Sequence, residues 1–221
     1  AGISLVSGDT GFYPLLLSAL LTLLLGSFPM LFVSKADNIT TKEGFMIVVG
    51  SWVLSCVVGM FPYLIWGGEF TVVNAWFESV SGFTTTGASI LDNIDSQPHT
   101  LLLWRSLTQW LGGLGIVFFT VAILPIFGID KVQLFAAEST GVAQRKVHSR
   151  ITVGSRWIFS IYMLLTTACA CSLKLCGMDW FDAINHALTT IATSGFSTRQ
   201  AGIAAFDSAQ IEYVLTLFMF L

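Results

Sequence analysis

The chain has 221 residues, of which 54% are hydrophobic and only 10% are charged, and its mean hydropathy is +0.78. Soluble domains carry about 25% charged residues, so this composition excludes an ordinary soluble protein and indicates a membrane protein. The net charge of −3 leaves no basic excess for binding nucleic acid.

Four apolar runs are long enough to cross a bilayer as helices. They are continuous rather than alternating, which favours helices over barrel strands, so we predict an all-α membrane protein. A fifth run starts at Ile211 and stops about halfway across a membrane. Because the chain also lacks an initiator Met, we expect it to be a piece of a longer multi-pass protein. The four long runs are 12–33, 44–66, 100–127 and 158–176.

Two further apolar segments, 71–83 and 180–192, are too short to span a membrane. Each ends in small, hydroxyl-bearing residues around a glycine, Gly87 in the first copy and Gly195 in the second. A short helix that ends in such a loop is typical of the pore helix and selectivity filter of a cation channel. One copy alone would favour an ordinary turn, but two copies in the same order favour the filter.

The two copies belong to an internal repeat with an offset of 108 positions. At this offset Thr85 matches Thr193, Gly87 matches Gly195 and Ser89 matches Ser197. The repeat predicts four regions: a preceding transmembrane helix and cytoplasmic loop (1–43), a first membrane–pore–membrane unit (44–127), a basic cytoplasmic loop (128–156) and a second unit that ends inside its last helix (157–221).

Converging backbone carbonyls can replace the water shell of a cation inside the membrane. Glycine permits the positive φ that turns successive carbonyls to one side, and we expect both Gly87 and Gly195 to adopt it. Hard cations with oxygen ligands fit such loops, so the transported ion is predicted to be K⁺, with Na⁺ as an alternative. No cofactor and no catalytic residue are predicted. The candidate ion-binding residues are Thr85, Thr86, Gly87, Ala88, Thr193, Ser194, Gly195 and Phe196.

Ionisable residues within the membrane segments are functional candidates. Glu78 and His186 occupy equivalent positions in the two short segments, and we expect them to support the filter loops from behind by hydrogen bonds rather than to line the ion path. Arg105, near an outer boundary, is expected to snorkel to the surface. Asp92 and Asp95 either concentrate cations at the outer mouth or form turns.

Lysine and arginine are distributed unevenly between the two sides of the predicted membrane segments. The stretches 34–43 and 128–156 hold seven of the ten, which places them in the cytoplasm and makes both filters open outward. The basic loop could also dock a cytoplasmic partner or anionic lipid.

The motifs Gly82–Ala88, Gln109–Ile116 and Ala122–Pro125 resemble the first repeat of bacterial Trk/Ktr potassium transporter membrane subunits of the TrkH type. Phe181–Ile184 and Ile191–Thr198 resemble the second repeat, and the similarity runs from about Lys42 to the end. The resemblance implies four repeats around one pseudo-fourfold pore, each giving one filter glycine. It also implies a homodimer in the bacterial inner membrane and a TrkA-like, nucleotide-binding regulatory ring on the cytoplasmic side.

The function favoured is potassium uptake through a carbonyl-lined filter. A sodium-coupled or weakly selective cation path keeps the same architecture and stays open. An intramembrane enzyme would need a nucleophile with a base or a metal cluster, and no HExxH or GxSxG string occurs. A non-conducting scaffold would tolerate replacement of the filter glycines.

Overall fold

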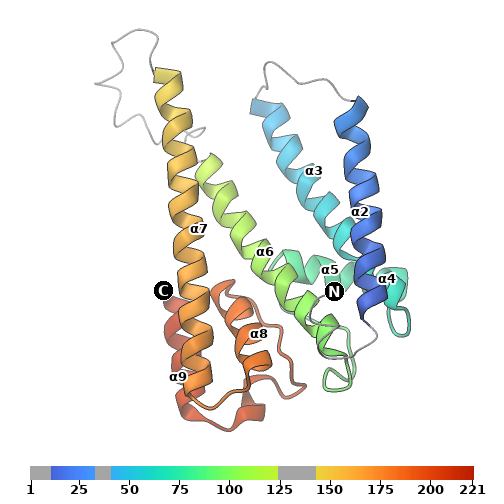
Figure 1. Cartoon of the computed structure of the whole chain (residues 1–221), viewed down its shortest axis with the longest axis vertical. Coiled ribbons are helices and arrows are strands. Elements are labelled where there is room, and N and C mark those ends of the chain that lie inside the picture. The colour runs from blue at the N-terminus through green and yellow to red at the C-terminus, as the bar shows by residue number, and fades with distance from the viewer. Residues whose placement is uncertain (1–10, 33–40, 124–142) are drawn as a thin grey trace.

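The computed structural model describes residues 11–32, 41–123 and 143–221. Throughout these residues the chain forms helices joined by turns, with no strand, so the predicted all-α class is confirmed (Figure 1). The helices are α2 (Phe12–Phe32), α3 (Thr41–Gly59), α4 (Phe61–Trp66), α5 (Val72–Phe83), α6 (His99–Ile123), α7 (Ala143–Leu175), α8 (Trp180–Ile191), the 3-10 turn η2 (Gly202–Phe206) and α9 (Ala209–Phe220).

Four stretches of these helices are long and apolar enough to cross a membrane, and each overlaps a predicted span. The leucines of the first stretch are mostly exposed, as expected of a helix whose outer face meets lipid, whereas half of the third stretch is buried inside the molecule. The stretches are Phe12–Pro29, Lys42–Trp66, His99–Phe119 and Gly154–Leu175.

Two predicted boundaries differ from the structure. The span predicted at 44–66 is interrupted at Met60, where α3 gives way to α4. Pro62 explains the break, because it has no N–H to donate to the preceding turn. The connection predicted at 128–156 is helical from Ala143, where α7 begins. The stretch from 143 to 156 has no proline, and its glutamine, lysine and arginine residues are good helix formers. Polarity alone therefore did not indicate a loop.

The short helices α5 and α8 have 12 residues each, and so extend about 18 Å at 1.5 Å per residue. The hydrocarbon core of a bilayer is about 30 Å thick, so neither helix can cross it. Their first turns are capped: Thr71 Oγ1 accepts from the Asn74 N–H, and the Asp179 carboxylate accepts from the Phe181 N–H at 3.1 Å. The Phe181 bond also lowers the pKa of Asp179.

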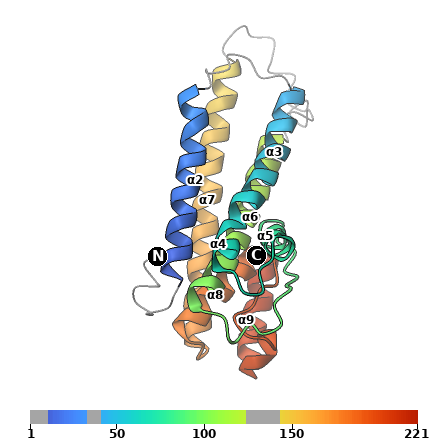
Figure 2. The same ribbon diagram turned by 90° about the vertical axis from the view of Figure 1, so that its right-hand side faces the viewer.

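Helix α6 links the two halves of the described structure, because it packs against both α5 and α8. The Thr41 end of α3, the Ile123 end of α6 and the Ala143 end of α7 lie at the upper end of the molecule in Figure 1. Both short helices and their following loops lie in the opposite half, and the quarter-turned view in Figure 2 agrees. The fold therefore brings the two predicted filter loops to the same region.

Candidate cation filter

The two short helices end in the same backbone turn. In each, the N–H of the residue that follows the C-cap bonds three residues back and the next N–H bonds five residues back, which is the Schellman arrangement. The first loop has Thr85 N–H to Gly82 O and Thr86 N–H to Ser81 O, both at 3.0 Å; the second has Thr193 N–H to Thr190 O at 2.9 Å and Ser194 N–H to Thr189 O at 3.0 Å.

A threonine occupies the left-handed position of both turns. Thr85 has φ +56° and Thr193 has φ +48°. This position usually holds glycine, and a β-branched side chain there is strained by about 1–2 kcal/mol. The same uncommon choice at equivalent positions shows that the repeat extends to backbone conformation.

The loops meet at their glycines. A Cβ built on Gly87 would lie 2.7 Å from both Cα and N of Gly195, closer than side chains are found in proteins. Gly87 has φ +77°, as expected. Gly195 does not have a positive φ, so that part of the expectation is wrong. A Cβ on Gly195 would meet Gly87 Cα at an ordinary 3.7 Å.

The side chains of Glu78 and His186 lie behind the loops at matching places. Glu78 is fully buried and accepts from the Ser89 hydroxyl and, at 2.9 Å, from the Ile90 N–H. His186 Nε2 lies 3.1 Å from the hydroxyl of Ser197, the equivalent serine.

The tautomer of His186 follows from its second contact. Its Nδ1 lies 2.8 Å from the Asp182 carbonyl, which can only accept a hydrogen bond, so Nδ1 bears the proton. Nε2 of the neutral ring then accepts from Ser197. Each short helix thus has a side chain that accepts a hydrogen bond from the hydroxyl two residues beyond the filter glycine.

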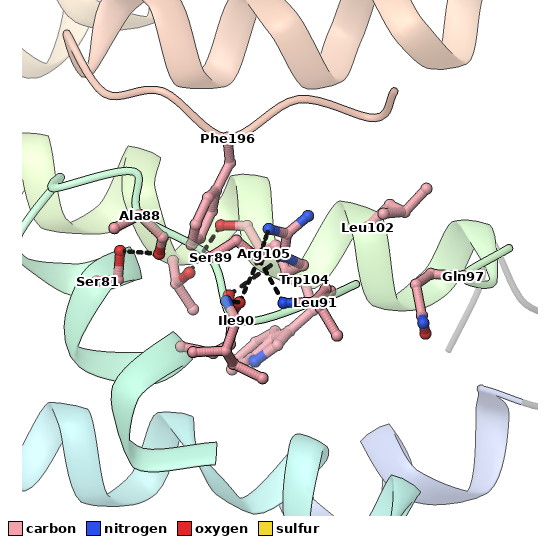
Figure 3. Close-up of polar contacts among 12 residues, drawn as sticks. Ser81, Ala88, Ser89, Ile90, Leu91, Gln97, Leu102, Trp104, Arg105 and Phe196 are labelled. Carbon is pink, nitrogen blue, oxygen red and sulfur yellow. Dashed lines mark hydrogen bonds and ion pairs between the residues drawn. The ribbon is translucent and has the colours of Figure 1, made fainter. Parts of the chain in front are cut away.

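Arg105 of α6 is buried, with 1% of its side chain exposed, so the expectation that it snorkels to the surface is wrong. Its Nε lies 3.4 Å from Glu78 Oε2, and its Nη2 donates to Ser89 Oγ at 2.9 Å. The guanidinium carbon lies 4.1 Å from the centre of the Phe196 ring, which descends from the second loop in Figure 3. The side chain is retained inside because a buried carboxylate and an aromatic face compensate its charge.

Gln109, one turn further along α6, binds only the second loop. Its Oε1 accepts from the Ser194 hydroxyl and, at 3.3 Å, from the Phe196 N–H. These two bonds lie on either side of Gly195 in the chain. Among the described residues, no side chain of α6 makes a similar pair of bonds around Gly87. The backbone N–H of Gly87 instead donates to the Ser81 carbonyl oxygen at 3.5 Å.

The remaining predicted site residues have varied surroundings. Thr86 and Thr193 are exposed, and Ser194 is half-buried. The carbonyl of Ala88 accepts from Ser81 Oγ at 2.5 Å, so it turns toward α5, as Figure 3 shows. Phe196 is buried with its ring against Arg105.

The outer connections of the two units bind each other through Gln200. Its Oε1 accepts from the Ile94 N–H at 2.8 Å, and its N–H donates to Asp95 Oδ2 at 3.4 Å. Asp95 therefore joins the two units, and both Asp92 and Asp95 are exposed.

Two glycines of α6 allow it to approach both loops. A Cβ on Gly112 would lie 2.1 Å from the Phe83 carbonyl oxygen, at the end of α5. A Cβ on Gly113 would lie 3.0 Å from Ala192 Cβ, at the end of α8. The small residues thus serve contact with the filter loops, which the sequence suggested only as general helix packing.

The family model for TrkH, described as a cation transport protein, matches residues 16–221. The chain belongs to the TrkH family. It is 44% identical over 187 residues to the Trk system potassium uptake protein TrkH of Escherichia coli, a match covering 84% of this chain and 39% of that protein. The protein TrkG of Escherichia coli is 38% identical over 83% of this chain and 38% of its own length. The resemblance inferred from the motifs is confirmed.

A solved structure agrees with these matches. The crystal structure of the potassium transporter TrkH from Vibrio parahaemolyticus superposes with a TM-score of 0.85 at 34% identity, covering 98% of this chain and 43% of that one. The chain therefore spans about two fifths of the relatives that it matches. Because the chain belongs to a family of cation transport proteins, the alternative of an intramembrane enzyme is rejected.

Sequence reasoning missed Arg105 and Gln109 as partners of the TrkH-type loops. Arg105 lies 92 positions from Ser197, and Gln109 lies 85 from Ser194, so no local pattern connects them. The one available signal was their spacing of four residues, which places both on the same face of α6.

Proposed function

We propose that this chain supplies two quarters of the filter of a potassium uptake protein in the bacterial inner membrane. Thr85–Gly87 and Thr193–Gly195 would offer backbone oxygens to a dehydrating K⁺ ion, and two further quarters would complete the ring. The observation that supports it best is the pair of matching turns at the ends of α5 and α8, whose glycines approach each other closely. The relatives are named as potassium uptake proteins, which supports the choice of ion.

Several features agree with a cation path. The C-terminal ends of α5 and α8, where the partial charge of a helix is negative, lead directly into the loops. The loops offer hydroxyl and carbonyl oxygens, which suit a hard monovalent cation. The buried carboxylate Glu78 is paired with Arg105, so it supports the loop without adding a net charge behind it.

The proposal includes orientation and assembly. The filters would open outward and the basic segment from 128 to 156 would lie in the cytoplasm, since that segment holds most of the basic residues. A homodimer with a TrkA-like nucleotide-binding ring is proposed from the resemblance alone. Sodium coupling or weak selectivity stays as the second candidate, because a filter with one glycine per repeat constrains few carbonyls.

The test compares the two filter glycines in the full-length protein, expressed in a bacterial strain without its own potassium uptake systems. Wild type should restore growth at low potassium. Gly87→Ala should lose most uptake, because its Cβ would strike the backbone of Gly195 and its φ is left-handed. Gly195→Ala should cause a smaller loss, because its Cβ has room.

Protein amount in the membrane is the control for both variants. Failure of wild type to restore growth, with no potassium uptake in a tracer assay, would overturn the assignment of the ion. Full uptake by a well-expressed Gly87→Ala variant would overturn the assignment of the filter. Sodium uptake measured in the same cells separates the two candidate ions.

A further inference from the structure

Helix α6 is in contact with both filter loops through a small set of polar groups. Arg105 bonds Ser89 of the first loop and contacts Phe196 and Ser197 of the second. Gln109 bonds Ser194 and Phe196 of the second loop alone. We propose that Arg105 and Gln109 are positioning residues that fix the spacing between the first two filter loops and thereby set cation selectivity. This inference rests on the proposed filter function.

The register of the contacts supports the proposal. Ser89 and Ser197 each follow a filter glycine by two residues. The Arg105 guanidinium reaches both serines: Nη2 lies 2.9 Å from the hydroxyl oxygen of Ser89, and Nη1 lies 3.5 Å from the backbone carbonyl oxygen of Ser197. One rigid, planar group therefore joins equivalent residues of the two loops. A change in the position of Arg105 would alter the distance between the loops at the level of the filter.

Burial makes this link stiff. The side chains of Arg105, Glu78 and Gln109 are at most 1% exposed, so water cannot replace their hydrogen bonds. The guanidinium and the Glu78 carboxylate neutralise each other, and the guanidinium also lies over the Phe196 ring. The Arg105–Glu78 part of the network is satisfied, and a buried, satisfied polar network specifies one arrangement of the groups that it joins.

Gln109 provides an independent argument. Its Nε2 is buried without a hydrogen-bond partner among the described residues. A buried donor without a partner lowers the folding stability of the protein, so a contribution to stability does not explain why an amide stands at this position. Its oxygen, in contrast, accepts from groups on both sides of Gly195. The amide therefore fits a role in holding the second loop.

The second unit does not repeat the two residues of this link. At the 108-residue offset, Tyr213 and Leu217 of α9 take the places of Arg105 and Gln109. Both are exposed, and neither can supply the same set of hydrogen bonds. By contrast, Thr108 and its counterpart Thr216 are identical. Arg105 and Gln109 thus differ from their counterparts in the second unit, while Thr108 does not.

The test uses two conservative variants of the full-length protein. Arg105→Lys keeps the positive charge beside Glu78 but loses the planar fork and its stacking on Phe196. Gln109→Met keeps the shape, loses both bonds to the second loop and removes the unpaired donor. Potassium-depleted cells of the uptake-deficient strain are given K⁺ or Na⁺, and initial uptake rates are measured per amount of protein in the membrane.

We expect the ratio of K⁺ to Na⁺ uptake to fall by about two- to tenfold in each variant, the size of effect that the loss of a hydrogen bond produces. A role confined to folding would lower the protein amount, or both rates alike, and leave the ratio unchanged. Thr166→Val is the matched control, because it removes the hydrogen bond from Trp110 Nε1 at 3.1 Å on a face of α6 that contacts α7. It should keep the wild-type ratio.

The outcomes separate this inference from the proposed function. Absence of cation uptake by wild type would overturn the function itself. A selective wild type with an unchanged ratio in Gln109→Met would overturn the positioning role of that residue, and the same result in Arg105→Lys would overturn the link between the loops. If Arg105→Lys does not accumulate in the membrane, Ser89→Ala takes its place, because it removes the acceptor of the 2.9 Å bond from Arg105 Nη2 to the first loop; an unchanged ratio in that variant would overturn the link.

Discussion

Thr85 and Thr193 are the residues in which the loops depart most from local preference. Each has a left-handed backbone that disfavours a β-branched side chain by about 1–2 kcal/mol. Both are retained at equivalent positions, which is expected where the surrounding structure determines the conformation. Their strain is therefore a feature of the candidate site and can be tested one residue at a time.

Replacing Thr85 with glycine should leave the protein as stable as wild type or slightly more stable. Relief of the left-handed strain offsets the entropic cost of glycine, which is about 0.5–1 kcal/mol. Thr86→Gly is the neighbouring control: the φ of Thr86 is not positive and its hydroxyl lies 2.7 Å from that of Thr84, so the variant should lose about 1 kcal/mol of folding stability. The measurement is the fraction of each variant that stays monodisperse after heating. Equal losses in both variants would contradict the strain argument.

Residue positions were predictable where the repeat itself pointed to them. Glu78 and His186 were paired by the offset of 108 positions, and the structure places both behind their loops. Arg105 was not predictable, because its position near a helix start suggested water while its partners lie far away in sequence. Its burial depends on Glu78 and Phe196, which only the fold brings together.

At the scale of elements, α6 determines how closely the two units approach. Its start and its apolar character followed from the sequence, as did the presence of α5 and α8. Their mutual packing did not, since glycines in an apolar helix indicate a close contact without naming the partner. The structure identifies the partners as the end of α5 at Gly112 and the end of α8 at Gly113.

Two alanine substitutions in α6 should have opposite results. Gly112→Ala forces a Cβ to within 2.1 Å of the Phe83 carbonyl oxygen, so α6 and the first loop must separate, at a cost of about 1–3 kcal/mol or more. Gly115→Ala meets only the Trp52 ring at 3.4 Å and should be neutral, or more stable by up to about 1 kcal/mol through helix propensity. Thermal stability and potassium uptake of the full-length variants provide the check. Equal thermal stability and equal uptake of the two variants would show that α6 does not contact the end of α5 closely at Gly112.

At the scale of the whole molecule, two units of similar build lie side by side with their short helices in the same half (Figures 1 and 2). The hydrophobic run lengths predicted this arrangement, because segments that are too short to cross must return to the side that they entered. The interruption at Met60 and the early start of α7 were not predicted. The first depends on one proline within an apolar run, and the second depends on helix formation by polar residues.

The proposed orientation can be tested with single cysteines at opposite ends of the molecule. Asn93 is exposed in the connection after the first loop, and Lys42 is exposed at the start of α3, at the other end. In intact cells, a membrane-impermeant maleimide should label Asn93→Cys, while Lys42→Cys should react only after the membrane is permeabilised. Wild type sets the background from the exposed native Cys171. Labelling of Lys42→Cys in intact cells, with Asn93→Cys protected, would place the filters on the cytoplasmic side. Uptake would then have to begin at the end of the molecule where α3 starts, and the role of the basic segment in setting the orientation would be wrong.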